Sequence, residues 1–367
     1  MDDRAGTRKL APVAAAATMH AMTDSERDQL IGPLLKAVSR SFYLTLRVLP
    51  PALRPAISLA YLMARASDTI ADTKVVARDK RREHLIRFRE QFERAVRADD
   101  LRLIQSDLGP HQSLSAEKVL LEKLDPCFEM LASLPDGDRR RIGELLGVIT
   151  RGQEDDLVKF PGESERELAA FETDAQLDEY TYAVAGCVGE FWTKMCVAHL
   201  PALGGWNAAE MTALGIRFGK GLQLTNILRD IPKDLRIGRC YVPRERLAEA
   251  GLKPADLLST AATEKFQPLY RRYLDRTLEH LDCGWRYTLA IPATERRLRL
   301  ACAWPILIGL KTLALLRRRT DVLDPNRHIM IFRGKVYWIL LKSLVICRND
   351  AAMDAWYRRL RAEAASA

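Results

Sequence analysis

Closely spaced cysteines and histidines are missing from this chain of 367 residues. None of its seven cysteines forms a CxxC pair and its six histidines are far apart, so the sequence indicates no zinc site. The number of cysteines is odd, which does not suit a framework of paired disulfides. We therefore expect reduced, mostly buried thiols in a cytoplasmic protein.

Long apolar runs are missing as well. The most apolar segment, residues 301–316, contains Pro305 and Lys311 and is shorter than the roughly 18 residues of a membrane-spanning helix. Residues 336–346 are shorter still and contain Lys342. The alanine-rich start of the chain is too short and too weak for a signal peptide, so we interpret residues 1–24 as a flexible leader.

The chain carries a net charge of +9, which suits three kinds of partner: nucleic acid, an anionic membrane or phosphorylated small molecules. Its basic clusters, such as residues 80–82, 139–141 and 317–319, are short, as expected of solvated helix faces. Zinc-finger spacing, an aromatic RNA-binding signature and a basic tail are all missing, so the sequence does not favour nucleic acid.

Helical periodicity dominates the sequence, and alternating β-branched runs with hairpin turns are rare, which predicts an all-α fold. Breaks between helices fall at Pro50, Gly204 and Pro325. No internal repeat and no long linker is visible. We therefore expect one large domain over residues 25–349, followed by a tail over residues 350–367.

The first of two acidic stretches lies in an apolar helical pattern. Asp68 and Asp72 are four residues apart, so on a helix they share a face, with Arg65 close by. Two like charges at this spacing repel each other, and a cation would offset the repulsion. Carboxylate oxygens suit Mg²⁺, which usually takes one or two carboxylates together with substrate phosphates.

The second acidic stretch carries Asn226, Asp230 and Asp234 at steps of four residues, with Gln223 one turn before them. A polar stripe on an otherwise apolar helix suggests that it lines a cavity. Pro232 removes a helical hydrogen bond and pushes the residue before it away from helical dihedrals. We therefore expect Asp234 to lie beyond a kink, on a turn rather than on the same stripe.

One DxxxD pattern alone is typical of a solvated helix face, but two such patterns, each in an apolar helix beside an arginine, favour a shared site. Ionisation of an allylic diphosphate requires a neutralised leaving group. Metal ions between carboxylates and phosphate oxygens provide this, and arginine assists. The resulting carbocation needs an apolar pocket that is poor in water and lined by aromatic faces.

At these residues the chain resembles the squalene/phytoene synthase family, and the resemblance covers most of its length. Residues 39–42 (SRSF) resemble the family's substrate-binding opening, and residues 61–72 resemble its first aspartate-rich motif. Residues 180–189 resemble its central tyrosine–glycine helix. Residues 222–234 and 239–243 resemble its second aspartate-rich motif and the flap that follows it.

The resemblance implies a helical bundle of the isoprenoid synthase type with a central active-site cavity. The residues that it implies as ligands of Mg²⁺ and the diphosphates are Asp68, Asp72, Asp230 and Asp234. The residues that it implies in catalysis are Tyr180, Tyr61, Arg65 and Arg229. Those that it implies in substrate binding are Ser39, Arg40, Ser41, Phe42, Gln223 and Asn226.

Within this set, Tyr180 would assist the first step near the departing diphosphate, and Tyr61 would face the cation. Taken without the motifs, both tyrosines also fit ordinary core packing. Gly186 and Gly189 would let helices approach closely. Lys233 stands where many family members carry an acidic residue, which lowers the negative charge beside Asp234.

The resemblance implies the family's shared first condensation but leaves the product open. We expect two farnesyl diphosphates to give squalene through presqualene diphosphate and NADPH, because residues 301–313 resemble the late helix of squalene synthases. Phytoene, dehydrosqualene or presqualene diphosphate, made without reduction, are the alternatives. Residues 215–221 are glycine-rich, but they lie in helical sequence with the wrong spacing for a dinucleotide-binding loop. The residues that would bind NADPH are therefore not assigned.

Two further classes of protein are kept as alternatives: a non-catalytic helical assembly factor and a basic scaffold at a membrane surface. Non-catalytic relatives of this fold lose the aspartates, and this chain keeps all four. For the enzyme we expect peripheral membrane contact, because the product would be an insoluble hydrocarbon. Residues 301–316 and 336–346 have apolar faces beside lysine and arginine, which suit either membrane contact or plain core packing.

Overall fold

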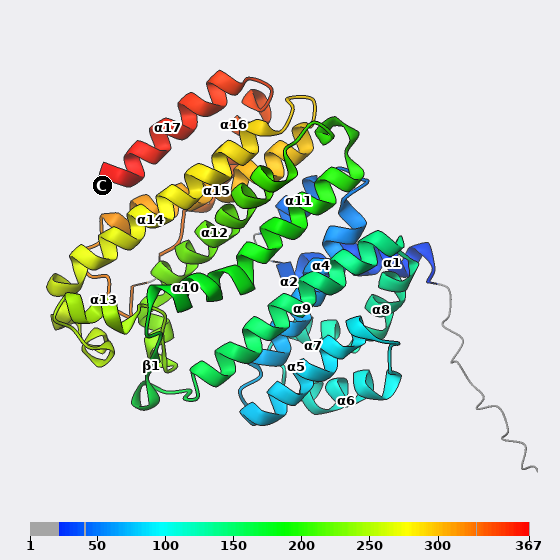
Figure 1. The fold of residues 1–367 in the computed structure, drawn as a ribbon, viewed down its shortest axis with the longest axis horizontal. Helices are drawn as coiled ribbons and strands as arrows, with labels where there is room; N and C mark the ends of the chain where they lie inside the picture. Colours follow the sequence, from blue (N-terminus) through cyan, green and yellow to red (C-terminus); the bar gives the residue numbers. More distant parts are fainter. Residues whose placement is uncertain (1–21, 40–41, 328, 367) are drawn as a thin grey trace, which may run out of the picture.

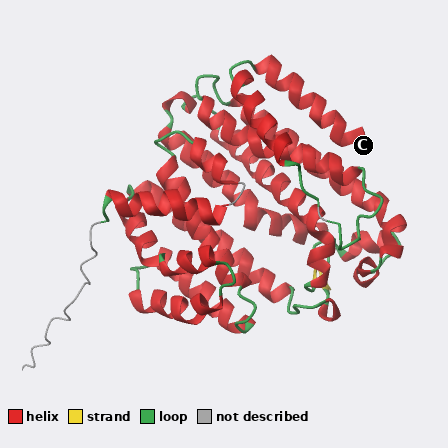
Figure 2. Cartoon of the chain, turned by 180° about the vertical axis from the view of Figure 1, so that it is seen from behind, coloured by secondary structure: helices red, strands yellow, loops and turns green. Residues whose placement is uncertain are grey.

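The computed structural model describes residues 22–39, 42–327 and 329–366, and Figure 2 shows that helices make up almost all of it. The predicted all-α fold is therefore confirmed. The helices are α1 (Asp24–Gln29), α2 (Leu35–Ser39), α3 (Tyr43–Val48), α4 (Arg54–Asp72), α5 (Arg78–Glu93), α6 (Ala98–Leu108), α7 (Ser115–Glu122), α8 (Leu124–Ser133), α9 (Asp136–Lys159), α10 (Asp174–Thr181), α11 (Cys187–His199), α12 (Ala208–Arg236), α13 (Arg244–Glu249), α14 (Thr263–Ala290), α15 (Arg296–Arg317), α16 (Arg333–Ile346) and α17 (Asp350–Ser366).

Shorter segments join these helices. The short helical turns are η1 (Leu30–Leu34), η3 (Gly109–His111), η4 (Glu165–Glu167), η5 (Tyr182–Gly186), η6 (Pro201–Leu203), η7 (Pro254–Leu258) and η8 (Thr260–Ala262). Two strands of two residues each, β1 (Ala169–Ala170) and β2 (Arg239–Cys240), pair in parallel. This pairing ties the segment after α9 to the segment after α12, so it holds the ends of these two helices together.

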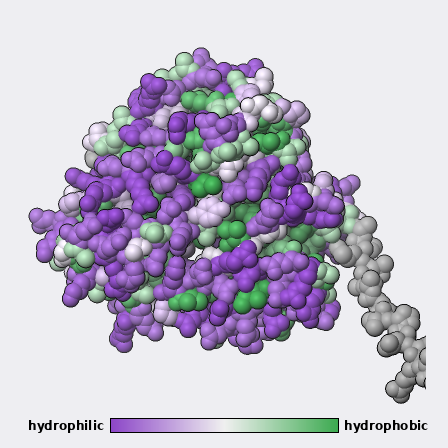
Figure 3. Space-filling view, in the orientation of Figure 1, coloured by the Kyte–Doolittle hydropathy of each residue, from purple (hydrophilic) through white to green (hydrophobic). Residues whose placement is uncertain are grey.

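The helices form two groups that share one bundle (Figure 1). In the first group α4 packs against α5, α8 and α9, and in the second α12 packs against α11, α14 and α15. Each group has its own cluster of buried apolar side chains, and α11 links them because it packs against both α9 and α12. The face of the molecule in Figure 3 is mostly hydrophilic, with apolar side chains visible only in patches.

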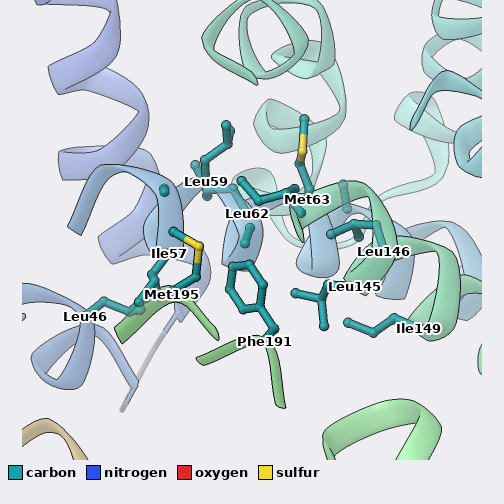
Figure 4. Packing of buried hydrophobic residues seen from close by; sticks show 14 of the residues in the cluster. Leu46, Ile57, Leu59, Leu62, Met63, Leu145, Leu146, Ile149, Phe191 and Met195 are labelled. Carbon is teal, nitrogen blue, oxygen red and sulfur yellow. The ribbon is translucent and has the colours of Figure 1, made fainter. Parts of the chain in front are cut away.

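Helix α4 shows how the core positions polar residues. Pro55 stands in its first turn, where a missing amide hydrogen costs no helical hydrogen bond. Its apolar face, which includes Leu59, Leu62 and Met63, is fully buried. Figure 4 shows these side chains meeting leucines of α9 and Phe191 of α11. The opposite face of α4 carries Tyr61, Arg65 and Asp68, which are half-buried, and Asp72, which is exposed.

Helix α12 continues through Pro232 and ends at Arg236. The prediction that Asp234 lies on a turn beyond a kink is therefore wrong, because Asp234 stands on the helix one turn after Asp230. Ile231, Pro232 and Leu235 are all buried in the second core cluster or beside it. Their burial holds the helix together where proline removes one hydrogen bond.

Helices α11 and α12 touch through their backbones. A side-chain carbon on Gly189 would lie 1.9 Å from the carbonyl oxygen of Gly215, and one on Gly219 would lie 2.2 Å from that of Ala185. Real atoms cannot approach so closely, so only glycine permits this helix contact. The expected role of Gly189 in close helix packing agrees with this geometry.

Helix α15 is a core helix. By length and composition it is the one helix among the described residues that is apolar enough to cross a membrane, but 78% of its most apolar window is buried inside the protein. Of the two interpretations given for residues 301–316, membrane contact or core packing, this burial supports core packing, because neighbouring helices cover the segment. Helix α16, in contrast, buries only Ile339 and Ser343.

Helix α17 covers residues 350–366, which the sequence analysis places in a tail. It packs along α15 and α14. The ring of Tyr357 stacks on Trp285 at 4.5 Å, and Arg361 forms an ion pair of 3.0 Å with Asp282. This segment is therefore part of the packed bundle. Most of the leader predicted over residues 1–24 lies outside the described residues.

All seven cysteines are buried and free, as the sequence analysis predicts. Burial raises the pKa of Cys127, Cys240 and Cys302 to about 12 in each case. These thiols therefore stay protonated at neutral pH and are poor nucleophiles.

The contact between α11 and α12 gives a test of the packing. We expect Gly189→Ala to lower the free energy of unfolding by about 1–3 kcal/mol, because the added methyl group forces the two helices apart. Chemical denaturation measures this change. Gly205→Ala is the control, since a side-chain carbon there has no atom within 4 Å. Equal stability of the two variants would contradict the close contact.

Candidate active site

A cavity lies between helices of the two groups. Its outer part has a volume of about 390 Å³ and is lined by polar and apolar residues of α2, α4, α12 and α15. Its inner part has a volume of about 170 Å³ and is mostly apolar. Both parts share Phe42, Thr45, Leu222, Asn226 and Pro305 as lining residues, so they adjoin. We call them the outer cavity and the inner chamber.

Many of the residues predicted for the site meet at this cavity, although they come from distant parts of the sequence. Those that line the outer cavity are Ser39, Phe42, Tyr61, Arg65, Asn226 and Arg229. Gln223, together with Phe42 and Asn226, lines the inner chamber. Arg40 and Ser41 lie outside the described residues. The hydroxyl of Ser39 donates a hydrogen bond to the carbonyl of Leu35 in its own helix.

Polar contacts fix the first aspartate pair on α4. Arg65 donates to Asp68 at 3.0 Å and to Glu117 at 3.0 Å, so one guanidinium bridges two carboxylates. The side-chain amide of Gln153 on α9 donates to the other oxygen of Asp68 at 2.6 Å. Burial raises the pKa of Asp68 to about 6 despite these contacts, and the carboxylate of Asp72 adds to the rise.

The second aspartate pair repeats this arrangement on α12. Arg229 donates to both oxygens of Asp230, at 2.9 Å and 2.6 Å. Burial, together with the charge of Asp230, raises the pKa of Asp234 to about 7. Lys233 acts in the opposite direction, so the basic residue beside Asp234 partly compensates for the crowded carboxylates.

Three residues that the sequence analysis missed complete the site. Arg239 pairs with Asp156 on α9 at 3.0 Å. The hydroxyl of Tyr180 donates to that of Tyr241 at 3.3 Å, and Tyr241 donates to Asp156 at 3.4 Å. The rings of Tyr180 and Tyr241 also stack at 4.9 Å. Burial raises the pKa of Tyr180 well above its usual value, so its phenol remains a hydrogen-bond donor.

Asp156 links the two aspartate motifs electrostatically. Burial raises its pKa to about 6 against the charge of Arg239, and the carboxylate of Asp72 adds to the rise. Asp156 in turn raises the pKa of Asp234. Carboxylates of α4, α9 and α12 therefore lie within electrostatic range of one another.

The donor atoms of the two motifs fit magnesium. They are carboxylate oxygens, which hard divalent cations prefer. Burial, and to a smaller degree a neighbouring carboxylate, raises the pKa of Asp68 and of Asp234, and a bound cation would offset both effects. Among the described residues there is no group of three or more His, Cys, Asp or Glu side chains placed to hold a metal alone. One or two carboxylates with diphosphate oxygens are a usual magnesium environment, so Asp68, Asp72, Asp230 and Asp234 fit metal held jointly with a diphosphate.

The walls of the cavity suit an isoprenoid chain. The ring of Phe42 stacks on Tyr61 at 5.6 Å, which places two aromatic faces beside Arg65 and Arg229 in the outer cavity. Trp192 and Phe218 line the inner chamber together with small and aliphatic residues. Aromatic faces stabilise cations, and apolar walls keep water away.

The glycine-rich run over residues 215–221 does not fit a dinucleotide. It lies inside α12, and no strand precedes it. Gly215 and Gly219 make the contact with α11, and a side-chain carbon on Gly221 would meet His280 of α14 at 3.0 Å. These glycines permit helix packing and present no loop of backbone amides to a phosphate.

Comparison with known proteins identifies what the chain is similar to. Residues 35–338 match the family model described as squalene/phytoene synthase. A bifunctional lycopene cyclase/phytoene synthase of Arthroderma gypseum is 31% identical over 66% of this chain, which spans 39% of that protein. The squalene synthase of Saccharomyces cerevisiae is 26% identical over 90% of this chain and 70% of its own length.

A presqualene diphosphate synthase of Sinorhizobium fredii is 28% identical over 81% of this chain and 93% of its own length. Among solved structures, the complex of TcSQS with the ligand BPH1237 has a TM-score of 0.72 at 21% identity. The match covers 93% of this chain and 98% of the TcSQS chain. This likeness shows a shared helical fold.

Asp156 gives a test of the site. We expect Asp156→Asn to weaken binding of Mg²⁺ with inorganic pyrophosphate by roughly 10-fold, because it removes a charge and leaves Arg239 without its partner. Isothermal titration calorimetry measures the affinity. Asp155→Asn is the matched control, since Asp155 is the neighbouring residue on the same helix and is exposed. Unchanged affinity in a folded Asp156→Asn protein would place Asp156 outside the site.

Proposed function

This chain belongs to the squalene/phytoene synthase family, and we propose that it is a prenyltransferase that joins two farnesyl diphosphates head to head. In this proposal presqualene diphosphate is formed first and is then reduced with NADPH to squalene. One observation supports it most directly. Arg65 and Arg229, each paired with an aspartate of its own motif, line one cavity that adjoins an apolar chamber.

The polar residues of this site would bind the diphosphate, and the apolar residues would hold the prenyl chain. Mg²⁺, held by the two aspartate pairs, would supply the positive charge that makes diphosphate a better leaving group. Arg65 and Arg229 would hold the diphosphate oxygens, since both guanidinium groups face the outer cavity. The phenol of Tyr180 stays protonated and can donate a hydrogen bond near the Asp156 end of the site.

The apolar part of the cavity would protect the cation. Phe42 and Tyr61 would present their aromatic faces to the allylic carbon that loses diphosphate. The inner chamber would hold the prenyl chain and exclude water, which would otherwise trap the cation as an alcohol. A folded chain is needed for this, because the lining residues come from α3, α11, α12, α14 and α15.

The relatives support two final products. Similarity to yeast squalene synthase extends over 90% of this chain, which favours squalene and with it NADPH. The presqualene diphosphate synthase of Sinorhizobium fredii is matched over 93% of its length, which favours a reaction that stops before reduction. We place squalene first because residues 301–313 resemble the late helix of squalene synthases.

Product analysis tests the proposal. We expect the purified protein, given farnesyl diphosphate and Mg²⁺, to form squalene only when NADPH is present, as identified by mass spectrometry. Presqualene diphosphate or dehydrosqualene with or without NADPH would reject the reductive step. Phytoene formed from geranylgeranyl diphosphate, with no product from farnesyl diphosphate, would show that geranylgeranyl diphosphate is the substrate.

Loss of either aspartate motif tests whether the chain is an enzyme at all. We expect Asp68→Ala and Asp230→Ala each to reduce the rate of farnesyl diphosphate consumption by at least about 100-fold, because each removes a charge that supports loss of diphosphate. Asp99→Ala is the control, since the side chain of Asp99 is 89% exposed on α6. An assembly factor or a scaffold would have no such activity to lose.

A further inference from the structure

Helix α16 and the loop before it present an apolar surface to solvent, which we call the α16 surface. Its members are Met330, Phe332, Tyr337, Trp338, Leu341, Leu344 and Val345, all large apolar or aromatic residues with exposed side chains. Met330 and Val345 are each 84% exposed, and Phe332 is 76% exposed. Residues 337, 341, 344 and 345 follow helical spacing, so they share one face of the helix.

Contacts of Ser343 and of the partly exposed Trp338 hold this helix on the protein. The indole nitrogen of Trp304 on α15 donates to the hydroxyl of Ser343 at 2.8 Å. The rings of Trp338 and Trp356 on α17 pack edge to face at 5.4 Å. Helix α16 is therefore anchored to α15 and α17, and Figure 1 shows it beside α17 at the end of the molecule away from α6. Its apolar face is a fixed feature of the bundle.

The segment that carries this face has charges of one sign only. Residues 329–348 contain no Asp or Glu, and their charged residues are Arg333, Lys335, Lys342 and Arg348. The ammonium group of Lys342 lies 5.0 Å from the ring of Trp338 and 4.6 Å from that of Trp356. A helix with an exposed apolar face, aromatic residues and only basic charges is typical of one that lies in a membrane interface.

A groove lined by arginines adjoins the α16 surface at Leu344. It has a volume of about 860 Å³ and is lined from α3, α4 and α15. Its arginines are Arg47, Arg54, Arg296 and Arg297, and the carboxylate-bearing residue Glu295 also lines it. Burial lowers the pKa of Arg54, and the charges of Arg297 and Arg47 lower it further, so these side chains repel one another. Among the described residues, no carboxylate forms an ion pair with any of the four.

We propose that the α16 surface and this groove dock the protein on an anionic phospholipid bilayer. The apolar side chains would enter the interface, and the arginines would bind phosphate groups of the lipids. Charge favours a bilayer over a second copy of this chain as the occupant. Two copies packed through this surface would bring together two helices whose only charged residues are basic (Arg333, Lys335, Lys342 and Arg348), and like charges repel.

The position of α3 connects this surface to product release, a role that rests on the proposed function. Thr45 on α3 lines both the outer cavity and the inner chamber, whereas Leu44, Arg47 and Val48 line the groove. Helix α3 therefore separates the cavity from the groove that adjoins the α16 surface. A water-insoluble hydrocarbon would leave past α3 into the bilayer without crossing water.

Vesicle flotation tests the docking independently of catalysis. We expect the full chain to float with vesicles of phosphatidylcholine and phosphatidylglycerol, to bind pure phosphatidylcholine vesicles less, and to lose binding as salt is raised. The variant Phe332→Ser/Leu341→Ser/Val345→Ser should bind at least about 10-fold more weakly. The matched control is Val96→Ser/Leu114→Ser/Val119→Ser, which removes exposed apolar residues far from α16 and should bind like the parent protein.

A second variant tests the groove. Arg47→Gln/Arg297→Gln should weaken binding to anionic vesicles by at least about 5-fold and leave binding to neutral vesicles unchanged. Circular dichroism shows whether each variant folds, and light scattering reports its mass.

The proposal is overturned if the parent protein does not bind anionic vesicles. It is also overturned if the parent is a dimer and the triple serine variant a monomer, since the surface would then be an interface between copies. Turnover of farnesyl diphosphate in detergent distinguishes failure of docking from failure of the proposed function.

Discussion

Repulsion between carboxylates is the constraint on which the site depends. Asp156 on α9 lies within electrostatic range of Asp72 on α4 and of Asp234 on α12, and burial makes the charges of Asp156 and Asp234 costly. Arg239 offsets part of this cost through its ion pair with Asp156. Arg65 and Arg229 do the same for Asp68 and Asp230, one in each aspartate motif. The protein thus holds a set of oxygen ligands that a divalent cation would stabilise, and packing of the apolar core keeps them in place.

That packing separates charge from hydrocarbon within one cavity. The apolar faces of α4, α9 and α11 pack together, and the polar face of α4 places Tyr61 and Arg65 in the lining of the outer cavity. On the opposite side, backbone contact at Gly189 and Gly215 draws α11 onto α12. The result is a polar outer cavity with arginines and an inner chamber lined by Trp192 and Phe218. Ionisation of a diphosphate and protection of a cation need this division.

Much of the site was predictable because its residues repeat at helical spacing. Asp68 and Asp72 fall one turn apart on α4, and the polar stripe of α12 follows the same rule. The error at Asp234 has a physical reason. A proline penalises a helix locally, but burial of Ile231 and Leu235 on either side of it outweighs that penalty. Asp156 was missed because its partners, Arg239 and Tyr241, lie more than 80 residues away and meet it through the pairing of β1 with β2.

The sequence by itself determined the helical class, the two aspartate motifs and the resemblance to a family, because each depends on residues close together in the chain. The tertiary structure alone decided which apolar helix is core and which is surface. Residues 301–316 and 336–346 have similar composition, yet α15 is enclosed by its neighbours and α16 is held along one side only. Burial is a property of what surrounds a helix, and local sequence does not contain that information.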